Sequence, residues 1–146
     1  MNDDLYIPPD GPPQGSGPNP AIHAQMGTEN IFAMCEVFYA ELEQSPIRPM
    51  FTDDMPAASR RLAAFLVGAC GGPPLYRELH GEPMMRKRHL PFAIDEEARQ
   101  VWLSCFKRVL ENADRDFGFP VEHRESFIAW LEDFSAWMVN RRPGQG

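Results

Sequence analysis

The sequence predicts an all-α domain behind a proline-rich N-terminal extension. Apolar residues recur at three- and four-residue steps in four separate segments, which is the spacing of amphipathic helices. No stretch keeps the period-two alternation of a half-buried strand. The length of 146 residues, with 43% hydrophobic content, suffices for one core and leaves no room for a second full domain.

We expect residues 1–24 to form a disordered extension and residues 25–146 to form the helical domain. The extension is crowded with proline and glycine, as in Gly11-Pro12-Pro13 and Pro18-Asn19-Pro20. Such a segment buries too little apolar surface to offset the entropy lost on ordering. Docking on a partner as an extended proline-rich segment is the alternative.

The first helix is predicted to begin at Thr28, because apolar residues share one helical face from there on. That face consists of Ile31, Met34, Cys35, Phe38 and Leu42. Thr28 or Asn30 can cap the helix, and Ser45-Pro46 ends it.

The second helix is predicted to follow Asp53 or Asp54, either of which can cap it, with Pro56 near the first turn. Its apolar face consists of Leu62, Phe65, Leu66, Ala69 and Cys70. The pair Gly71-Gly72 ends this helix, since glycine favours helix termination.

The third helix opens with Asp95-Glu96-Glu97, whose carboxylates suit a helix N-terminus. Its apolar face consists of Val101, Trp102, Cys105, Phe106, Val109 and Leu110. The fourth helix starts near Pro120, and its apolar face consists of Phe127, Trp130, Leu131, Phe134 and Met138. Residues 71–94 form a long, irregular, polar connection, and connections of this kind tend to be functional.

Composition excludes several classes of partner. The net charge of -7 and the pI near 5.0 oppose binding to nucleic acid or to an anionic membrane. Residues 1–4 lack the features of a secretory signal, and no apolar run reaches the length of a membrane span, so we expect a cytoplasmic protein. Cys35, Cys70 and Cys105 show neither CxxC nor zinc spacing and are predicted to be reduced core residues.

The candidate chemistry lies in the irregular connection, where Arg86-Lys87-Arg88-His89 is followed by Leu90-Pro91-Phe92. A basic cluster with apolar neighbours, in an otherwise acidic chain, suggests an anionic, apolar ligand that contains a metal. Haem fits this description, because imidazole holds the iron, apolar side chains cover the macrocycle and cations pair with the propionates. Composition alone favours a more ordinary interpretation, a solvated charge run beside a surface or core histidine.

Several motifs follow one another in order along the chain. They are Phe38-Tyr39, Pro49-Met50-Phe51, Asp53-Asp54, Gly71-Gly72-Pro73-Pro74-Leu75-Tyr76, His80-Gly81, Arg86-Lys87-Arg88-His89-Leu90-Pro91-Phe92 and Val101-Trp102-Leu103-Ser104-Cys105. Together they resemble the group II truncated haemoglobins over roughly residues 26–140. The resemblance implies a shortened globin in which two pairs of helices form a two-over-two sandwich around haem b, with a loop-rich proximal segment.

By this resemblance, His89 is the proximal metal ligand, bonded to iron through Nε2 while an acceptor orients its other ring nitrogen. Trp102 and Tyr39 are the distal residues, and each can donate a hydrogen bond to a small ligand. One neutral bond of this kind contributes roughly 0.5–1.5 kcal/mol. Spacing alone would also allow both to be packing aromatics of the core.

The resemblance also implies which side chains enclose the haem. Ala58 stands where many globins place a distal histidine or glutamine, so Trp102 would carry more of the stabilisation. Leu62, one turn later, would form an apolar wall. Phe51 would stack against the haem, and Phe92 would contact it.

Arg61, Tyr76 and Arg88 match the positions that hold the propionates in relatives, and the arginine fork suits a carboxylate. Arg86 or Lys87 could replace Arg88 if the chain turned differently. A merely solvated role is the alternative for each of these side chains.

Two classes of function follow for diatomic ligands such as oxygen, carbon monoxide and nitric oxide. The first is redox chemistry on nitric oxide or peroxide, with electrons from a separate reductase, because the chain is too short for its own flavin or nicotinamide domain. The second is non-enzymatic oxygen storage, delivery or sensing. A third hypothesis is a haem-free helical interaction module. Relatives occur as monomers and dimers, and either state is compatible with the sequence.

Overall fold

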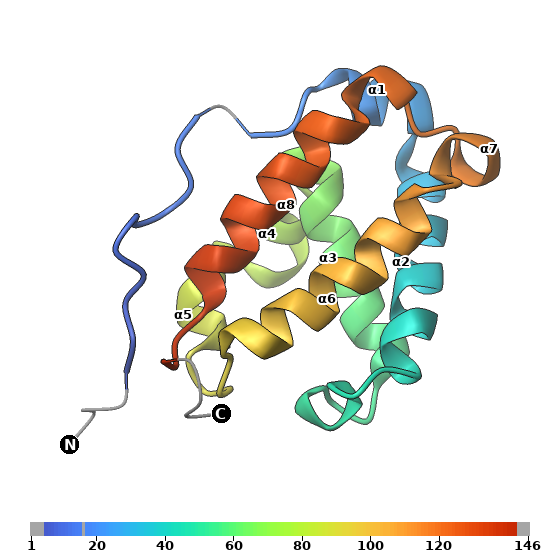
Figure 1. The fold of residues 1–146 in the computed structure, drawn as a ribbon. Coiled ribbons are helices and arrows are strands. Elements are labelled where there is room, and N and C mark those ends of the chain that lie inside the picture. Colours follow the sequence, from blue (N-terminus) through green and yellow to red (C-terminus); the bar gives the residue numbers. More distant parts are fainter. Residues whose placement is uncertain (1–4, 16, 143–146) are drawn as a thin grey trace.

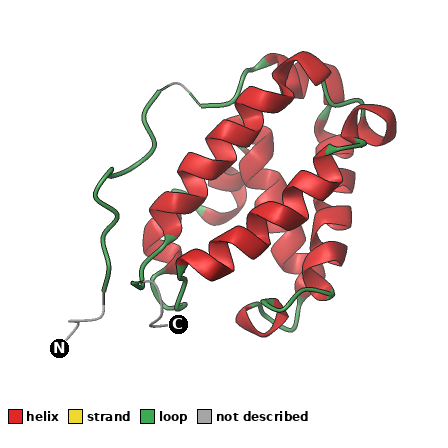
Figure 2. Ribbon diagram, in the orientation of Figure 1, coloured by secondary structure: helices red, strands yellow, loops and turns green. Residues whose placement is uncertain are grey.

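The chain folds into helices joined by short connections (Figure 2). The computed structural model describes residues 5–15 and 17–142. Within these residues there is no β-strand, which confirms the predicted all-α class. None of the helices in the described part of the chain is both long and apolar enough to cross a membrane.

Four long helices form two layers (Figure 1). In one layer α2 (Thr28–Glu43) packs against α3 (Met55–Ala69), and in the other α6 (Glu96–Leu110) packs against α8 (Arg124–Met138). Contacts between α2 and α6 join the two layers. All four predicted helices are therefore present.

Aspartate caps define where two of these helices begin. The carboxylate of Asp54 accepts a hydrogen bond from the Ala57 amide at 3.1 Å, and that of Asp95 accepts one from the Ala98 amide at 2.9 Å. Each bond satisfies an amide that has no partner inside the helix. The predicted cap of α3 is thus confirmed as Asp54. Asp95, which the sequence placed at the start of α6, is the cap of that helix.

The predicted caps of α2 are wrong. Gly27 precedes the helix with φ 81°, and the N-terminus has no side-chain cap. The hydroxyl of Thr28 lies 2.9 Å from Nε2 of His23 instead, and Asn30 does not act as a cap. The physical reason is that a short helix, α1 (Ala21–Met26), comes directly before α2, and only Gly27, with its positive φ, separates the two helices.

Short helices occupy most of the connections between the long helices, and another short helix precedes α2. They are α1, η1 (Arg48–Met50), α4 (Leu75–His80), α5 (Met85–His89), α7 (Ala113–Phe117) and η2 (Val121–His123). The connection at residues 71–94 is loop-rich, as predicted, but contains α4 and α5. Helices of six and five residues are too short to reveal a period in the sequence.

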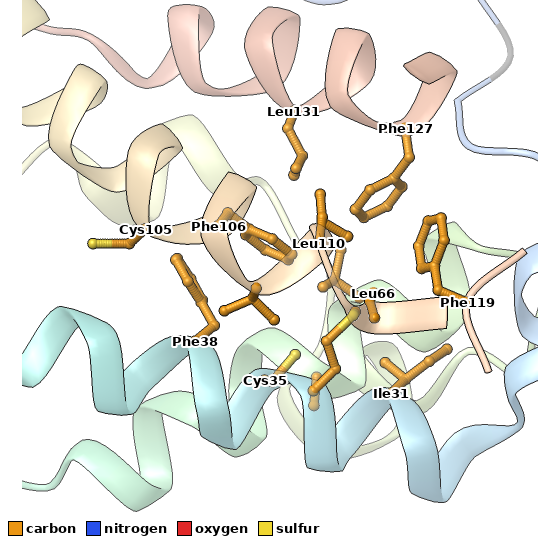
Figure 3. Close-up of a cluster of buried hydrophobic side chains, with 14 of the residues drawn as sticks. Ile31, Cys35, Phe38, Leu66, Cys105, Phe106, Leu110, Phe119, Phe127 and Leu131 are labelled. Carbon is orange, nitrogen blue, oxygen red and sulfur yellow. The ribbon is translucent and has the colours of Figure 1, made fainter. Parts of the chain in front are cut away.

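The hydrophobic core lies where the four long helices meet (Figure 3). The predicted apolar face of α2 is buried over its whole length. Phe38 and Phe106 pack across the layers with ring centroids 4.3 Å apart. All three cysteines are unpaired and buried, as predicted, and burial raises the pKa of the Cys70 thiol to about 12.

The N-terminal part of the chain packs on the turn after α3. A Cβ at Gly72 would lie 2.6 Å from the His23 ring, and one at Gly71 would lie 2.6 Å from Pro20. Only glycine permits this approach, and Gly71 also has φ +98°. The division at residue 24 stays a prediction, and α1 spans that boundary. Residues 1–4, 16 and 143–146 lie outside the described residues.

Candidate functional site

A cavity of about 340 Å³ lies between the two helical layers. All ten residues proposed from the sequence line it: Tyr39, Phe51, Ala58, Arg61, Leu62, Tyr76, Arg88, His89, Phe92 and Trp102. This volume falls within the ~300–1,000 Å³ typical of small-molecule and cofactor sites. The structure therefore brings together residues from α2, α3, α4, α5 and α6 that lie far apart in the sequence.

His89 enters the cavity from the end of α5. Its Nδ1 lies 2.7 Å from the carbonyl oxygen of Met85, one turn earlier in the same helix. A carbonyl can only accept, so Nδ1 carries the proton and donates it, and Nε2 of the neutral ring keeps its lone pair. The local helix thus sets both the tautomer and the ring orientation that metal ligation requires.

Arg88 has a structural role that the sequence did not indicate. Its Nε donates to the carbonyl of Pro83 at 2.6 Å, and its Nη2 donates to those of Glu82 and His80 at 2.8 and 2.9 Å. The guanidinium also lies 5.3 Å from the ring centroid of Tyr76. Arg88 therefore lines the cavity while it closes the loop between α4 and α5.

The two alternatives to Arg88 are not at the cavity. Arg86 donates to the backbone carbonyls of Tyr6, Trp137 and Val139, none of which lines the cavity, and Lys87 is exposed. Arg61 is exposed on α3 and lines the cavity, and it takes part in none of the ion pairs within residues 5–15 and 17–142. Of Arg61, Arg86 and Arg88, Arg61 therefore has the fewest polar contacts with the described part of the protein.

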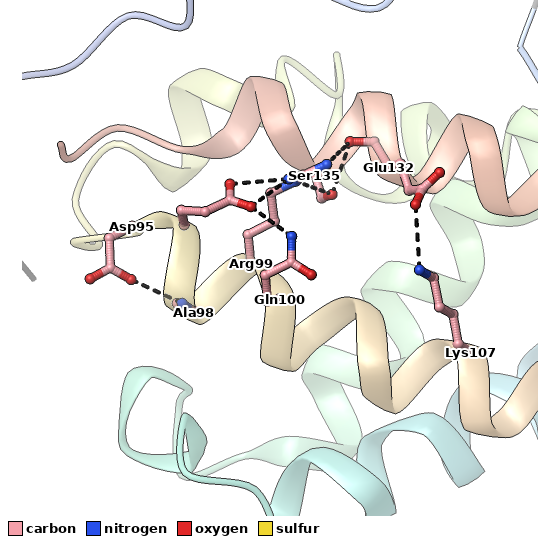
Figure 4. Close-up of polar contacts among 8 residues, drawn as sticks. Asp95, Ala98, Arg99, Gln100, Lys107, Glu132 and Ser135 are labelled. Atoms are coloured by element: carbon pink, nitrogen blue, oxygen red, sulfur yellow. Dashed lines mark hydrogen bonds and ion pairs between the residues drawn. The ribbon is translucent and has the colours of Figure 1, made fainter. Parts of the chain in front are cut away.

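Sequence reasoning missed a further cation, Arg99 of α6 (Figure 4). It forms an ion pair with Glu96 at 2.8 Å, and its Nε donates to the Ser135 hydroxyl at 3.0 Å. A third bond reaches the carbonyl of Glu132 at 2.8 Å, so Arg99 ties α6 to α8 beside the cavity. Its position three residues before Trp102, on the same helix face, was the signal available in the sequence.

Tyr39 and Trp102 reach the cavity from different layers. Phe38 fixes both rings by edge-to-face contacts, with centroids 5.6 Å from Tyr39 and 5.5 Å from Trp102. Burial raises the pKa of the Tyr39 phenol above its ordinary value of 10.0, so the phenol keeps its proton. Within the described residues, neither the Tyr39 phenol oxygen nor the Trp102 indole nitrogen is among the buried polar atoms that lack a hydrogen-bond partner. This agrees with both atoms facing the cavity.

The remaining walls are mostly apolar. Ala58 and Leu62 face the cavity one turn apart on α3, as the sequence indicated, and Phe51 follows η1. The sequence did not assign the other lining residues, which are Ile47, Met50, Thr52, Phe65, Met85, Ile94, Ala98, Phe134, Ser135 and Met138. Three of them, Phe65, Phe134 and Met138, belong to predicted apolar helix faces. The cavity thus interrupts the apolar core that the helices form.

One edge of the cavity is open to solvent. Phe92 is 46% exposed although it lines the cavity, and Arg61 and Arg88 are both exposed as well. Charged side chains at the open edge and apolar side chains inside suit a flat ligand whose apolar body is covered and whose anionic groups reach water.

Comparison with known proteins decides which family has this arrangement. The bacterial-like globin family matches residues 22–140. The chain belongs to this family. Group 2 truncated haemoglobin YjbI of Bacillus subtilis strain 168 is 37% identical over 122 residues, which cover 83% of this chain and 89% of the relative.

Solved structures agree with this assignment. The phosphate-bound Hell's gate globin IV matches with a TM-score of 0.81 and 37% identity, covering 89% of this chain and 81% of that chain. The truncated oxygen-avid haemoglobin from Bacillus subtilis matches with a TM-score of 0.74 and 36% identity, covering 84% and 99%. The predicted truncated-globin fold is confirmed. As a group 2 truncated haemoglobin, the chain is a haem globin that binds diatomic ligands.

The residues of this truncated haemoglobin fit haem. The His89 tautomer leaves Nε2 as a ligating atom, the interior walls are apolar, and two arginines stand at the open edge. These are the three features that a haem site requires: an axial ligand, cover for the macrocycle and partners for the propionates.

Proposed function

We propose that this truncated haemoglobin binds haem b through Nε2 of His89 and carries out redox chemistry on nitric oxide or peroxide. The observation that carries the proposal is the meeting of two protonated donors, Tyr39 and Trp102, in one cavity with an imidazole whose Nδ1–H is already engaged. Haem, when bound, supplies an iron that takes up diatomic ligands.

The chain contributes a fixed position and a dry environment. The Met85 carbonyl orients His89, and the apolar side chains of Leu62 and Phe51 exclude water from the interior. Arg61 and Tyr76 line the cavity and would hold the propionates of a bound haem. Arg88 contributes there with the part of its guanidinium that does not donate to Pro83, Glu82 and His80.

Tyr39 and Trp102 hold protons at the phenol oxygen and the indole nitrogen. Each donates to the partial negative charge that develops on a diatomic ligand in the cavity, and each bond contributes roughly 0.5–1.5 kcal/mol. The Ala58 methyl group cannot donate, so the aromatic pair supplies the polar contact that globins often obtain from this position of α3. Slow ligand release and polarisation of the ligand are two effects of the same bonds.

The two proposed reactions are the oxidation of nitric oxide by oxygen and the reduction of hydrogen peroxide. One oxygen molecule, one nitric oxide molecule and one electron give one nitrate ion. One hydrogen peroxide molecule, two electrons and two protons give two water molecules. The electrons come from a separate reductase or another one-electron donor.

The first experiment is the absorption spectrum of the wild type and of His89→Ala, as isolated, after dithionite and after carbon monoxide. The matched control is His80→Ala, because His80 is exposed and does not line the cavity. We expect a haem band that shifts with carbon monoxide in the wild type and the control and that is lost or altered in His89→Ala. An unchanged spectrum in His89→Ala would remove the ligand assignment.

The second experiment separates redox chemistry from oxygen storage. Oxygenated protein is mixed with nitric oxide and a chemical reductant, and nitrate is counted over many turnovers. We expect continued nitrate formation that falls in Tyr39→Phe and Trp102→Phe. Slow oxygen release without turnover on nitric oxide or peroxide would reject the enzymatic proposal in favour of storage, delivery or sensing.

A further inference from the structure

The helix that carries His89 cannot owe its stability to itself. α5 contains five residues, and isolated helices of this length are unstable in water. It also starts from Met84 in the left-handed conformation, with φ 40° and ψ 54°, which non-glycine residues rarely adopt unless their surroundings impose it. Contacts from outside α5 must therefore hold the helix in place.

Asn140 holds the end of α5 and the loop that follows. Its side chain is completely buried, and its amide nitrogen donates to the carbonyls of His89 and Phe92 at 3.2 and 2.8 Å. Its Oδ1 accepts from the Ile94 amide at 2.9 Å. Both side-chain donors and the acceptor of Asn140 are thus directed at the segment from His89 to Ile94.

Arg86 holds the start of the same helix. Its guanidinium donates to the carbonyls of Trp137, Val139 and Tyr6, the last two at 2.9 Å. It also lies 4.6 Å from the ring centroid of Trp137. Arg86 follows Met85 directly, so these contacts fix the peptide whose carbonyl orients His89.

The N-terminal segment joins these two anchors. The amide of Tyr6 donates to the backbone carbonyl of Asn140 at 2.9 Å, and the carbonyl of Tyr6 accepts from Arg86 at 2.9 Å. Figure 1 shows that this segment starts near the C-terminal end of α8 and runs from there toward α1. A segment distant in sequence therefore closes the network around α5.

We propose that Tyr6, Arg86 and Asn140 form a proximal clamp that positions His89. This inference rests on the proposed function, in which His89 is the haem ligand. Neither Arg86 nor Asn140 lines the cavity, so both are positioning residues that act through the backbone of α5. The clamp limits how far the imidazole can tilt or withdraw, and so governs the strength of its bond to iron and the retention of haem.

Two pairs of variants test the clamp. Asn140→Ala removes both donors and the acceptor, and Asn112→Ala is its control because Asn112 is exposed and its side chain caps no helix. Arg86→Gln removes the guanidinium, and Lys87→Gln is its control because it removes an exposed cation from the same helix.

The main measurement is the iron–histidine stretching band of the reduced, haem-loaded protein in resonance Raman spectra. We expect the band to shift or broaden in Asn140→Ala and Arg86→Gln and to stay at the wild-type position in both controls. Transfer of haem to excess apomyoglobin should be at least about tenfold faster in the two clamp variants, since each leaves buried backbone groups without partners. A purely structural role would lower the thermal midpoint without moving the band.

A second variant and a haem-free measurement keep the outcomes distinct. Arg86→Gln leaves the three side-chain bonds of Asn140 in place, so it should shift the band even if Asn140→Ala does not fold. Hydrogen exchange of the Ile94 amide in haem-free protein should be protected in the wild type and not in Asn140→Ala. Haem binding through His89 with an unmoved band in every clamp variant would overturn the clamp alone. A wild type that binds no haem would overturn the proposed function. If the Ile94 amide of that haem-free wild type were also unprotected from hydrogen exchange, the clamp would be overturned too.

Discussion

Tyr39→Phe removes one hydroxyl from the cavity and little else. The ring contacts with Phe38 at 5.6 Å and Phe51 at 5.9 Å depend on the aromatic ring, which the variant keeps. The phenol is protonated because burial raises its pKa, so the lost group is a donor. The change in oxygen release should therefore report one hydrogen bond.

The magnitude follows from the net strength of a neutral hydrogen bond, roughly 0.5–1.5 kcal/mol. With about 1.4 kcal/mol per tenfold change, the loss corresponds to about 2- to 12-fold faster oxygen dissociation if the whole effect lies in that rate. The mostly apolar lining of the cavity favours the upper end, because a hydrogen bond is stronger in apolar surroundings than in water. A phenol with its ordinary pKa of 10.0 would be half ionised at pH 10, whereas the buried phenol stays neutral, so the wild-type rate should be the same at pH 8 and pH 10.

The assay is stopped-flow displacement of oxygen by carbon monoxide, at pH 8 and pH 10. Tyr6→Phe is the control, because it removes a phenol hydroxyl outside the cavity and keeps the backbone groups that Tyr6 uses. A Tyr39→Phe rate equal to that of the wild type, or a wild-type rate that rises as pH approaches 10, would refute the reasoning.

Three predictions concern folding, each measured by urea unfolding. Gly72→Ala should lower the free energy of unfolding by about 1–3 kcal/mol, because its Cβ would lie 2.6 Å from the His23 ring. Its control is Gly68→Ala, whose Cβ meets only ordinary contacts and which should not destabilise the fold. Equal losses in the two variants would contradict this prediction. Asp95→Ala should cost ~0.5–2 kcal/mol through the lost cap of α6, and no measurable loss would argue against capping. Burial raises the Cys70 pKa from 9.0 to about 12, so above pH 9.0 the unfolded chain loses a proton that the folded chain keeps. Stability should fall as pH rises through this window, by at most ~1.4 kcal/mol per pH unit, and Cys70→Ala should reduce the slope.

The long helices could be predicted because their causes are local. A helix face is written as a three- and four-residue spacing, and a cap such as Asp54 or Asp95 lies next to the amides that it satisfies. The short helices α1, α4 and α5 could not be predicted in this way, since they contain too few turns to show a period and are stabilised by packing.

The candidate site was predictable as a set of residues but not as a geometry. Ordered motifs indicated the lining residues, because each motif is contiguous. They did not indicate that Arg88 donates to three loop carbonyls, or that Arg99 bonds Ser135 across two helices. Such contacts depend on distance in space and leave no mark in the local sequence.

By itself the sequence determined the helical class, the positions of the long helices and the family of the chain, since periodicity, capping and motif order are properties of neighbouring residues. Only the tertiary structure decided the tautomer of His89 and the contacts that hold its helix. Asn140 lies 51 residues from His89, and Tyr6 lies 80 residues from Arg86. No local pattern specifies those pairings, because they form only when the packed layers bring distant backbone groups within hydrogen-bonding distance.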